Sequence, residues 1–238
     1  MGKKGAAPVK GYFRKISSDY QKSVEKESIA GVHQRIQEQV NPQLHGVVLD
    51  LGSGGVTSFR SDRVTRLISM DNVLEFLKNS RNPDARSVCG DVLAIPLGSR
   101  SVDVVIMQHV IHHLTAPSYA QNARNVGQAI SETSRILKSG GAFHLIDSFT
   151  PAAWERLQIW AYPVSYGALR LAGKPMVFFH SARHLSRLLE LNNLAVDRIQ
   201  KIDWGEMAEA SQALFPWLKF PLKYTPMACL LISARLKA

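Results

Sequence analysis

Short apolar runs alternate with amphipathic segments through the middle of the chain. Strand-like runs occupy residues 46–51, 64–70, 87–91, 101–107 and 142–147. Runs of this kind are typical of strands buried on both faces of a parallel sheet. Helical spacing of apolar residues marks 17–40, 72–78, 121–138 and 181–191, and weaker strand patterns follow at 195–202 and 227–234. This alternation predicts an α/β fold with an open, doubly wound, mainly parallel sheet.

Acidic residues stand at the ends of three predicted strands, as Asp50, Asp71 and Asp91. In an open α/β sheet, ligands bind beyond the carboxyl ends of the strands, beside the first one. There the turn Gly52-Ser53-Gly54-Gly55 would let the backbone approach a ligand closely. Asp71 follows Asp50 by 21 residues, the distance at which an acid binds the hydroxyls of a ribose. Each acid alone is more typical of a turn or cap, but together they predict a nucleoside-containing cofactor.

A dinucleotide is disfavoured, because the Gly-x-Gly-x-x-Gly fingerprint needs glycine where Thr57 stands. The chain instead resembles the class I S-adenosylmethionine (SAM) dependent methyltransferases, specifically the methyltransferase type 11 group that includes the ubiquinone and menaquinone biosynthesis methyltransferases. Five ordered segments within residues 46–147 carry the resemblance: VVLDLGSGG (47–55), ISMDN (68–72), GDVLAIPL (90–97), SVDVVIMQHVIHHL (101–114) and RILKSGGAFHLID (135–147). It implies a Rossmann-like, seven-stranded, mainly parallel sheet with an antiparallel last strand. The sequence departs from the group at Val56, usually a glycine, and in a short interval to the second strand that predicts an abbreviated first helix.

The resemblance implies two groups of cofactor-binding residues. Around the methionine half of SAM, the glycine turn would pack against the ligand, Asp50 would fix the ammonium, and the end of the fourth strand would lie beside the transferable methyl; these residues are Asp50, Gly52, Ser53, Gly54, Met107 and Gln108. Around the nucleoside, Asp71 would accept from both ribose hydroxyls with Asn72 nearby. Asp91 would accept from the adenine amino group while the backbone N–H of Val92 faces the ring. The product would be S-adenosylhomocysteine.

Three histidines follow the fourth strand. A helix would bring His109, His112 and His113 to one face, which suggests a metal, but neither cysteine is near and the His-His-Leu of the resembling family accounts for two of them. No metal is therefore predicted. A histidine here would lie beside the methyl-transfer point, so all three are candidates for a general base. His109 and His113 come first and His112 is the reserve, while packing stays open as the role of the pair 112–113.

Aromatic residues are dense between the fifth strand and the next predicted helix. In the resembling family an insertion here caps the substrate pocket, which predicts an acceptor lining of Phe149, Trp154, Trp160, Tyr162 and Tyr166, with Tyr20 in an opposing N-terminal lid beside Tyr12 and Phe13. Extra core is one alternative. A membrane-facing amphipathic surface is another, because Arg156, Arg170 and Lys174 are interleaved with the aromatics.

Charge bears on the partner. Lys and Arg number 29 against 19 Asp and Glu, a formal charge of +10, which favours acidic partners. The excess is uneven: residues 1–15 hold five basic side chains and no acid, whereas 41–147 hold ten basic and nine acidic ones. Nucleic acid is therefore disfavoured without being excluded. Peripheral membrane contact and a monomer or homodimer stay open.

Two cysteines in strand-like segments, Cys89 and Cys229, predict buried thiols in a reducing compartment. Without an 18-residue apolar stretch or a signal-like N-terminus, the sequence predicts a cytoplasmic protein with no transmembrane segment.

The chain length of 238 residues predicts one methyltransferase domain over 1–238. Its expected parts are an N-terminal lid with helices (1–45), a SAM-binding core (46–147), a substrate-capping insertion (148–180) and the C-terminal part of the sheet (181–238). The expected activity is methyl transfer to O, N or C of a small, aromatic or apolar metabolite. The alternatives are an RNA methyltransferase and a non-catalytic SAM-binding protein. Against the former, the Pro-Pro-Tyr/Phe motif of amino-directed nucleic-acid enzymes is replaced by Met107-Gln108-His109-Val110.

Overall fold

The computed structural model of the chain describes residues 7–17, 32–57, 59–80, 82–203 and 227–237. Its strands form one seven-stranded sheet in the order β3-β2-β1-β4-β5-β7-β6. All neighbours are parallel except β7, which runs antiparallel to both β5 and β6. The strands are β1 (Gly46–Leu51), β2 (Val64–Asp71), β3 (Ala85–Cys89), β4 (Val102–Gln108), β5 (Leu137–Phe149), β6 (Leu194–Lys201) and β7 (Ala228–Leu236). The predicted fold, with its antiparallel last strand, is confirmed.

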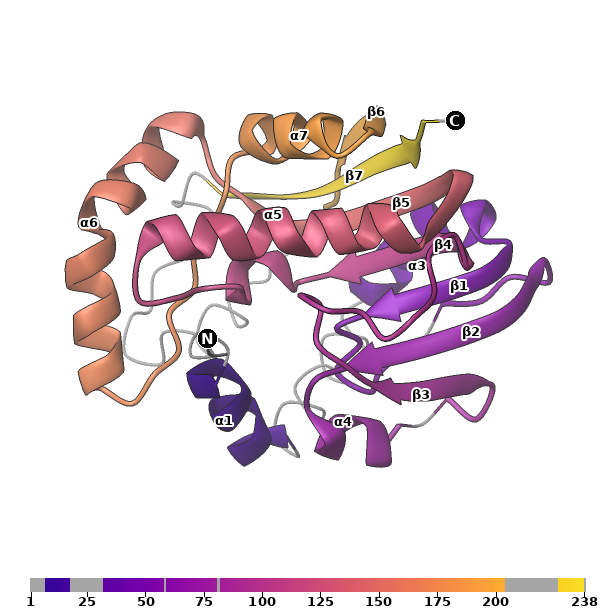
Figure 1. Cartoon of the computed structure of the whole chain (residues 1–238), viewed down its shortest axis with the longest axis horizontal. Helices are drawn as coiled ribbons and strands as arrows, with labels where there is room; N and C mark the ends of the chain where they lie inside the picture. Colours follow the sequence, from indigo (N-terminus) through magenta and orange to yellow (C-terminus); the bar gives the residue numbers. More distant parts are fainter. Residues whose placement is uncertain (1–6, 18–31, 58, 81, 204–226, 238) are drawn as a thin grey trace.

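Helices cover both faces of the sheet (Figure 1). α5 (Tyr119–Ile136) and α7 (Ala182–Leu191) lie on one face and α3 (Val32–Val40) on the other. Successive strand residues point to opposite faces, so Leu49 packs with α5 and α7 whereas Val48 packs with α3. The sheet is thus buried on both sides, which is why its strands read as continuous apolar runs.

The remaining helices lie toward the carboxyl ends of the first strands. α1 (Ala7–Lys15) and α4 (Leu74–Lys78) lie on that side in Figure 1, and α6 (Ala152–Leu171) forms an outer edge of the molecule. Short 3₁₀ turns occupy Asn41–Gln43 and Ile111–His113. Strand order reverses between β1 and β4, so the crevice beyond these two strands is the topological switch point where ligands bind in such sheets.

The structure differs from the sequence-based picture in four places. The sequence predicts an abbreviated helix between β1 and β2, but none of the described residues there is helical. The insertion after β5 contains the 20-residue helix α6. The helix predicted over 17–40 is described only as α3, because 18–31 lie outside the described residues. Cys89 is exposed, since β3 is an edge strand, whereas Cys229 is buried as predicted.

Among the described residues, no helix is both long and apolar enough to span a membrane.

Candidate functional site

The glycine turn after β1 is held in a conformation that only glycine adopts readily. Gly52 has φ +77°, and a Cβ there would collide with the side chain of Val110. The backbone N–H groups of Gly52 and Ser53 both donate to the carbonyl of Met70 on β2, at 2.7 and 3.1 Å. The turn is therefore fixed against the neighbouring strand and lies at the floor of the crevice.

A chain of hydroxyl groups supports the turn from below. Thr57 Oγ1 donates to Ser69 Oγ (3.0 Å), which donates to Ser53 Oγ (2.7 Å). Thr57 and Ser69 are buried. The threonine that breaks the dinucleotide fingerprint thus serves to anchor the loop.

Asp71 closes the turn from the end of β2. Its Oδ2 accepts from the Gly54 N–H at 2.9 Å and its Oδ1 from the Val73 N–H at 2.8 Å. Burial raises the pKa of this carboxyl, and these backbone hydrogen bonds oppose the rise. Each carboxylate oxygen has a further lone pair, so Asp71 can still accept from a ligand hydroxyl.

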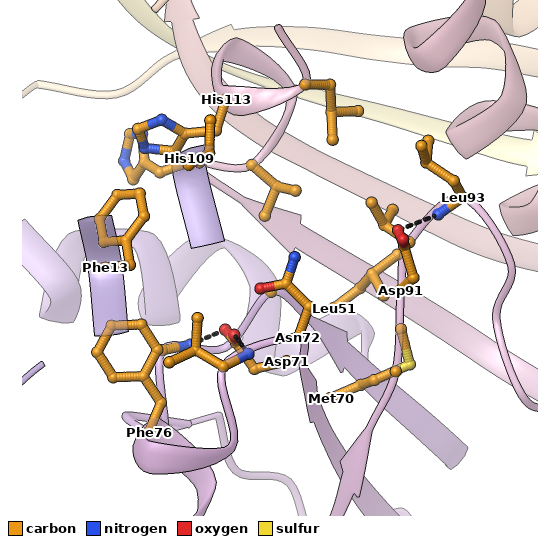
Figure 2. A pocket seen from close by; sticks show the side chains of 18 of the residues that line it. Phe13, Leu51, Met70, Asp71, Asn72, Phe76, Asp91, Leu93, His109 and His113 are labelled. Atoms are coloured by element: carbon orange, nitrogen blue, oxygen red, sulfur yellow. Dashed lines mark hydrogen bonds between the residues drawn. The ribbon is translucent and has the colours of Figure 1, made fainter. Parts of the chain in front are cut away.

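An open pocket lies above this turn (Figure 2). Figure 2 shows Asp71, Asn72 and Asp91 on one side, and the rings of Phe13, His109 and His113 on another. The lining combines acids, backbone at glycines and apolar walls: Val9, Phe13, Leu51, Gly52, Gly54, Met70, Asp71, Asn72, Val73, Phe76, Gly90, Asp91, Val92, Leu93, His109, Val110, His113, Leu114, Thr115 and Asn125. One polar wall and one apolar wall suit a ligand that is part nucleoside and part amino acid.

The sequence-predicted residues divide by their position around this pocket. Those that line it are Gly52, Gly54, Asp71, Asn72, Asp91, Val92, His109 and His113. Those outside its lining are Asp50, Ser53, Met107, Gln108 and His112. Asp50 and Met107 are buried within their strands. Their cofactor roles stay predictions.

α1 covers one side of the pocket. Phe13 packs edge-on against His113, with ring centroids 4.9 Å apart, and lies 6.3 Å from Phe76 of α4. Arg14 Nε pairs with Glu75 Oε1 at 2.7 Å and fastens α1 to α4. Phe13 thus lies where the sequence predicted an N-terminal lid, while Tyr20 lies outside the described residues.

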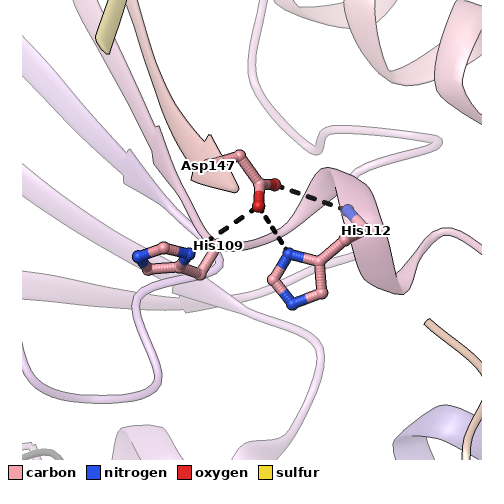
Figure 3. A group of neighbouring side chains, drawn as sticks. All are labelled: His109, His112 and Asp147. Atoms are coloured by element: carbon pink, nitrogen blue, oxygen red, sulfur yellow. Dashed lines mark hydrogen bonds and ion pairs between the residues drawn. The ribbon is translucent and has the colours of Figure 1, made fainter. Parts of the chain in front are cut away.

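Two histidines converge on one buried carboxylate at the end of β5 (Figure 3). His112 Nδ1 lies 2.6 Å from Asp147 Oδ1, and His109 Nδ1 lies 3.7 Å from the same oxygen. Burial alone would raise the pKa of Asp147, but the neighbouring His112 and His109 outweigh it and hold that pKa far below its usual range. Asp147 is therefore an anion that orients both rings.

The backbone conformation of His109 supports a role for this residue in the site. It has φ +56°, a left-handed conformation that is uncommon for a residue with a side chain. Its N–H donates to the Ile146 carbonyl at 2.8 Å, so the end of β4 stays bonded to β5 while the chain turns. Such conformations cluster at functional sites, because the surrounding structure must hold them.

A metal is a second use of this cluster, because His109, His112 and Asp147 each offer a ligand atom. Zinc holds its ligand atoms about 3.3 Å apart, since Zn–N and Zn–O bonds are about 2.0–2.1 Å and the geometry is tetrahedral. The 2.6 Å between His112 and Asp147 is shorter than this and is a hydrogen-bond distance. The arrangement therefore favours a histidine–aspartate pair.

His113 differs from its neighbours. Burial, with the nearby His112 adding to it, holds the pKa of His113 well below its ordinary value, so the ring is neutral at pH 7. Its Nδ1 has no hydrogen-bond partner among the described residues. A neutral imidazole that resists protonation is a weak general base, so His109 is the better placed of the two histidines in the pocket.

The predicted acceptor-lining aromatics do not gather in one place. Trp154 and Trp160 are 46% and 81% exposed on α6. Tyr162 is buried in a small apolar cluster with Met176 and Phe178. Phe149 belongs to the main core.

Tyr166 lines a second pocket, together with Arg170, Lys174 and Met176 among others. Val9 and Thr115 line both pockets, so the two spaces adjoin.

Sequence reasoning missed several residues of the site. Asp147 carried the signal that identified the other acids, a carboxylate at the end of a parallel strand, but it was not assigned a role. Thr115 and Asn125 carried no such signal, because a polar residue in a loop or helix has many ordinary uses. Phe76 read only as a helix core position.

The raised pKa of Asp50 predicts that the free energy of unfolding depends on pH. Burial, and to a smaller degree the charge of Asp71, raises this pKa to about 7, although the neighbouring Thr57 hydroxyl acts in the opposite direction. The unfolded chain releases this proton near pH 4, so between these values the folded state binds more protons and stability falls as pH rises. Asp50→Asn removes the titration. Relative to the parent, its unfolding free energy from urea denaturation should rise by about 2–3 kcal/mol between pH 5 and 8.

The exposed Asp62→Asn is the control for this experiment, and its difference from the parent should not change with pH. A constant difference for Asp50→Asn as well would show that Asp50 titrates normally in the folded protein.

The chain is similar to known proteins in part of its sequence and in its fold. The methyltransferase domain family matches residues 49–145. A proposed methyltransferase of Encephalitozoon cuniculi is 35% identical over 96 residues, which span 40% of this chain and 41% of that protein. The chain thus matches well under half the length of this relative.

Solved structures share the fold over nearly the whole chain. A proposed methyltransferase in complex with the Trm112 methyltransferase activator of Haloferax volcanii has a TM-score of 0.66 and 17% identity, covering 95% of this chain and 98% of that one. The 1,6-didemethyltoxoflavin-N1-methyltransferase of Burkholderia thailandensis, with bound 1,6-didemethyltoxoflavin and S-adenosylhomocysteine, has a TM-score of 0.62 and 15% identity, covering 98% and 89%. Residues 49–145 of the chain therefore match the methyltransferase domain family, and the chain as a whole shares the fold of these solved methyltransferases.

Proposed function

We propose that this protein transfers a methyl group from SAM to O, N or C of a small, apolar or aromatic acceptor. The observation that carries the proposal is the single pocket that joins Asp71 and Asp91 to His109 across the switch point of the sheet. When bound, SAM supplies the methyl group from its sulfonium and is left as S-adenosylhomocysteine.

The chemistry of the pocket fits this cofactor. Asp71 would accept from the ribose hydroxyls, and Asp91 from the adenine amino group, with Asn72 and Val92 beside the nucleoside. Asp91 is already oriented, because its Oδ1 accepts from the Leu93 N–H at 3.0 Å. The turn at Gly52 and Gly54 would lie against the methionine half.

The protein's own contribution would be alignment, exclusion of water and proton removal. Phe13 and α1 would cover the bound molecules from solvent. His109 would take a proton from the acceptor, and the nearby Asp147 anion would stabilise the imidazolium that results. His112 would hold Asp147 in place, which makes it a positioning residue.

The second pocket supports an acceptor of particular chemistry. It adjoins the cofactor pocket at Val9 and Thr115 and presents Tyr166, Arg170 and Lys174. An aromatic ring beside two cations suits an apolar or aromatic molecule that carries an acidic group. The proposal therefore keeps Tyr166 as an acceptor-lining residue, with the insertion 148–180 and the stretch 1–45 as the two covers of a single domain over 1–238.

An RNA substrate is the second candidate. It is favoured by the net charge of +10. We also propose a cytoplasmic location and a monomeric or homodimeric state. A biosynthetic role and membership of the quinone-methyltransferase subgroup are further parts of the proposal.

Labelled SAM distinguishes these functions. Incubated with the protein, a metabolite extract should yield one labelled small molecule that is retained by an anion exchanger, and cell RNA should stay unlabelled. Label in RNA would favour the second candidate. Label in neither, with SAM binding intact, would favour a non-catalytic SAM-binding protein. Asp71→Ala should give no label, whereas the exposed Asp84→Ala should match the parent.

A further inference from the structure

A second cluster of ionisable groups lies away from the pocket, between α6 and α7. Glu155, in the first turn of α6, faces His180 and His184 at the start of α7. Glu155 Oε1 lies 3.2 Å from His180 Nδ1 and 3.1 Å from His184 Nδ1. Glu155 and His180 are buried at 5% and 2% exposure, in contrast to an ordinary surface ion pair.

The cluster is held in place by bonds that leave these atoms facing one another. Ser181 donates to the other carboxylate oxygen, Glu155 Oε2, through its hydroxyl at 2.6 Å and its backbone N–H at 3.2 Å. The His180 carbonyl accepts from the Thr150 N–H at 3.1 Å, and the His180 ring packs edge-on against Phe178. Outer bonds of this kind orient metal ligands in known sites.

Two of the three separations between the facing atoms are close to those of a zinc site, and all three atoms lie within 4.8 Å of one another. Separations of 3.1 and 3.2 Å are close to the roughly 3.3 Å between neighbouring ligands of tetrahedral zinc, whereas the cluster at Asp147 contains one of 2.6 Å. Two histidines and one glutamate are a known zinc ligand set, with a fourth position open to water.

The ionisation of the groups agrees with this use. Burial alone would raise the pKa of Glu155, but hydrogen bonds from His180, His184 and Ser181 hold it well below its usual range. Burial lowers the pKa of His180. A carboxylate and a neutral imidazole are the forms that bind a metal.

We propose that Glu155, His180 and His184 form a zinc site that fastens the start of α6 to the start of α7. The side chain of His184 is 29% exposed and provides the route by which an ion enters. The site is independent of methyl transfer, since none of its residues lines either pocket. By joining α6 to α7, the ion would fix the base of the helix whose other end carries Tyr166 and Arg170.

Zinc titration of the chelator-treated, full-length protein tests the site. Zinc should bind with one-to-one stoichiometry by calorimetry, and a thousandfold excess over Kd should raise the melting temperature by about 10 °C. His184→Gln removes a ligand while its amide can still donate to Glu155, so zinc affinity should fall at least about 100-fold with little change in the metal-free melting temperature. If the three side chains form only a hydrogen-bonded cluster, zinc would neither bind to the parent protein nor raise its melting temperature, and the proposal would be wrong.

Two further variants locate the ion. His109→Gln alters the cluster at Asp147 and His45→Gln alters an exposed histidine, and both should bind zinc like the parent. Loss of binding in His109→Gln with retention in His184→Gln would overturn the assignment.

The absorption spectrum of bound Co²⁺ tests directly whether the side chain at position 184 coordinates the ion. Co²⁺ bound to the parent should show visible bands of a tetrahedral site, and His184→Cys should add a thiolate-to-cobalt charge-transfer band. No such band in a folded, cobalt-binding His184→Cys would place the ion elsewhere. If His184→Gln fails to fold, His109→Gln and His184→Cys still show which of the two clusters holds the ion.

Discussion

Replacing His109 with asparagine should lower turnover about 100- to 10,000-fold and leave SAM affinity within a few fold of the parent, the range that a lost general base typically gives. His109 lines the cofactor pocket, and its Nδ1 lies 3.7 Å from the buried Asp147 carboxylate. In the proposed mechanism, that anion would stabilise the ring once it had taken a proton from the acceptor. Asparagine is the informative substitution, because it tolerates the left-handed backbone at φ +56°.

Single-turnover kinetics with the identified acceptor measures the effect, and isothermal titration with SAM measures the affinity. His45→Asn is the matched control, since that histidine is exposed and outside the lining of both pockets. The same substitution at His112 and His113 separates the candidates. If all three variants keep turnover within a few fold, alignment alone carries the reaction, as it would for an unprotonated amine acceptor.

The second large effect concerns the cofactor. Asp71→Ala should weaken SAM binding more than 100-fold, because two ribose hydrogen bonds to a charged acceptor are together worth about 3 kcal/mol or more. The structure adds a further reason. The same carboxylate accepts from the N–H groups of Gly54 and Val73, so its loss would also release the turn that we propose to lie against SAM.

Calorimetry with SAM measures this loss, and circular dichroism with a melting curve establishes that the variant is folded. Asp71→Asn separates the two causes: it keeps an oxygen and the shape of the side chain but no charge, so it should lie between alanine and the parent. Unchanged SAM binding in a folded Asp71→Ala variant would contradict the ribose assignment.

Much of the fold could be read from the sequence because the relevant forces are local or periodic. The strand at Gly46–Leu51 is a continuous apolar run because both faces of the sheet are covered, and Val64–Asp71 reads the same way. The α6 helix could not be read, since its apolar residues are spread around its circumference, and Trp160 is exposed while Tyr162 is buried. Periodicity gives no signal where a helix has no single buried face.

Part of the candidate site could likewise be predicted from the sequence, and part could not. Asp50, Asp71 and Asp91 were recognisable because a parallel sheet brings strand ends to one edge, and that edge follows from strand order alone. Burial then decided their chemistry: Asp50 lies beneath the turn with a pKa near 7, which its place in the sequence does not indicate.

The sequence by itself determined the order of the strands, the glycine turn at 52–54 and the acids beside it, because these depend on hydrophobic periodicity and on residues close together in the chain. Only the tertiary structure decided which side chains meet. His112 and Asp147 are 35 residues apart in the sequence, and Glu155 and His180 are 25 residues apart with most of α6 between them. Such pairs depend on where two elements dock, and docking is set by shape and burial across the whole core, so no local pattern encodes it.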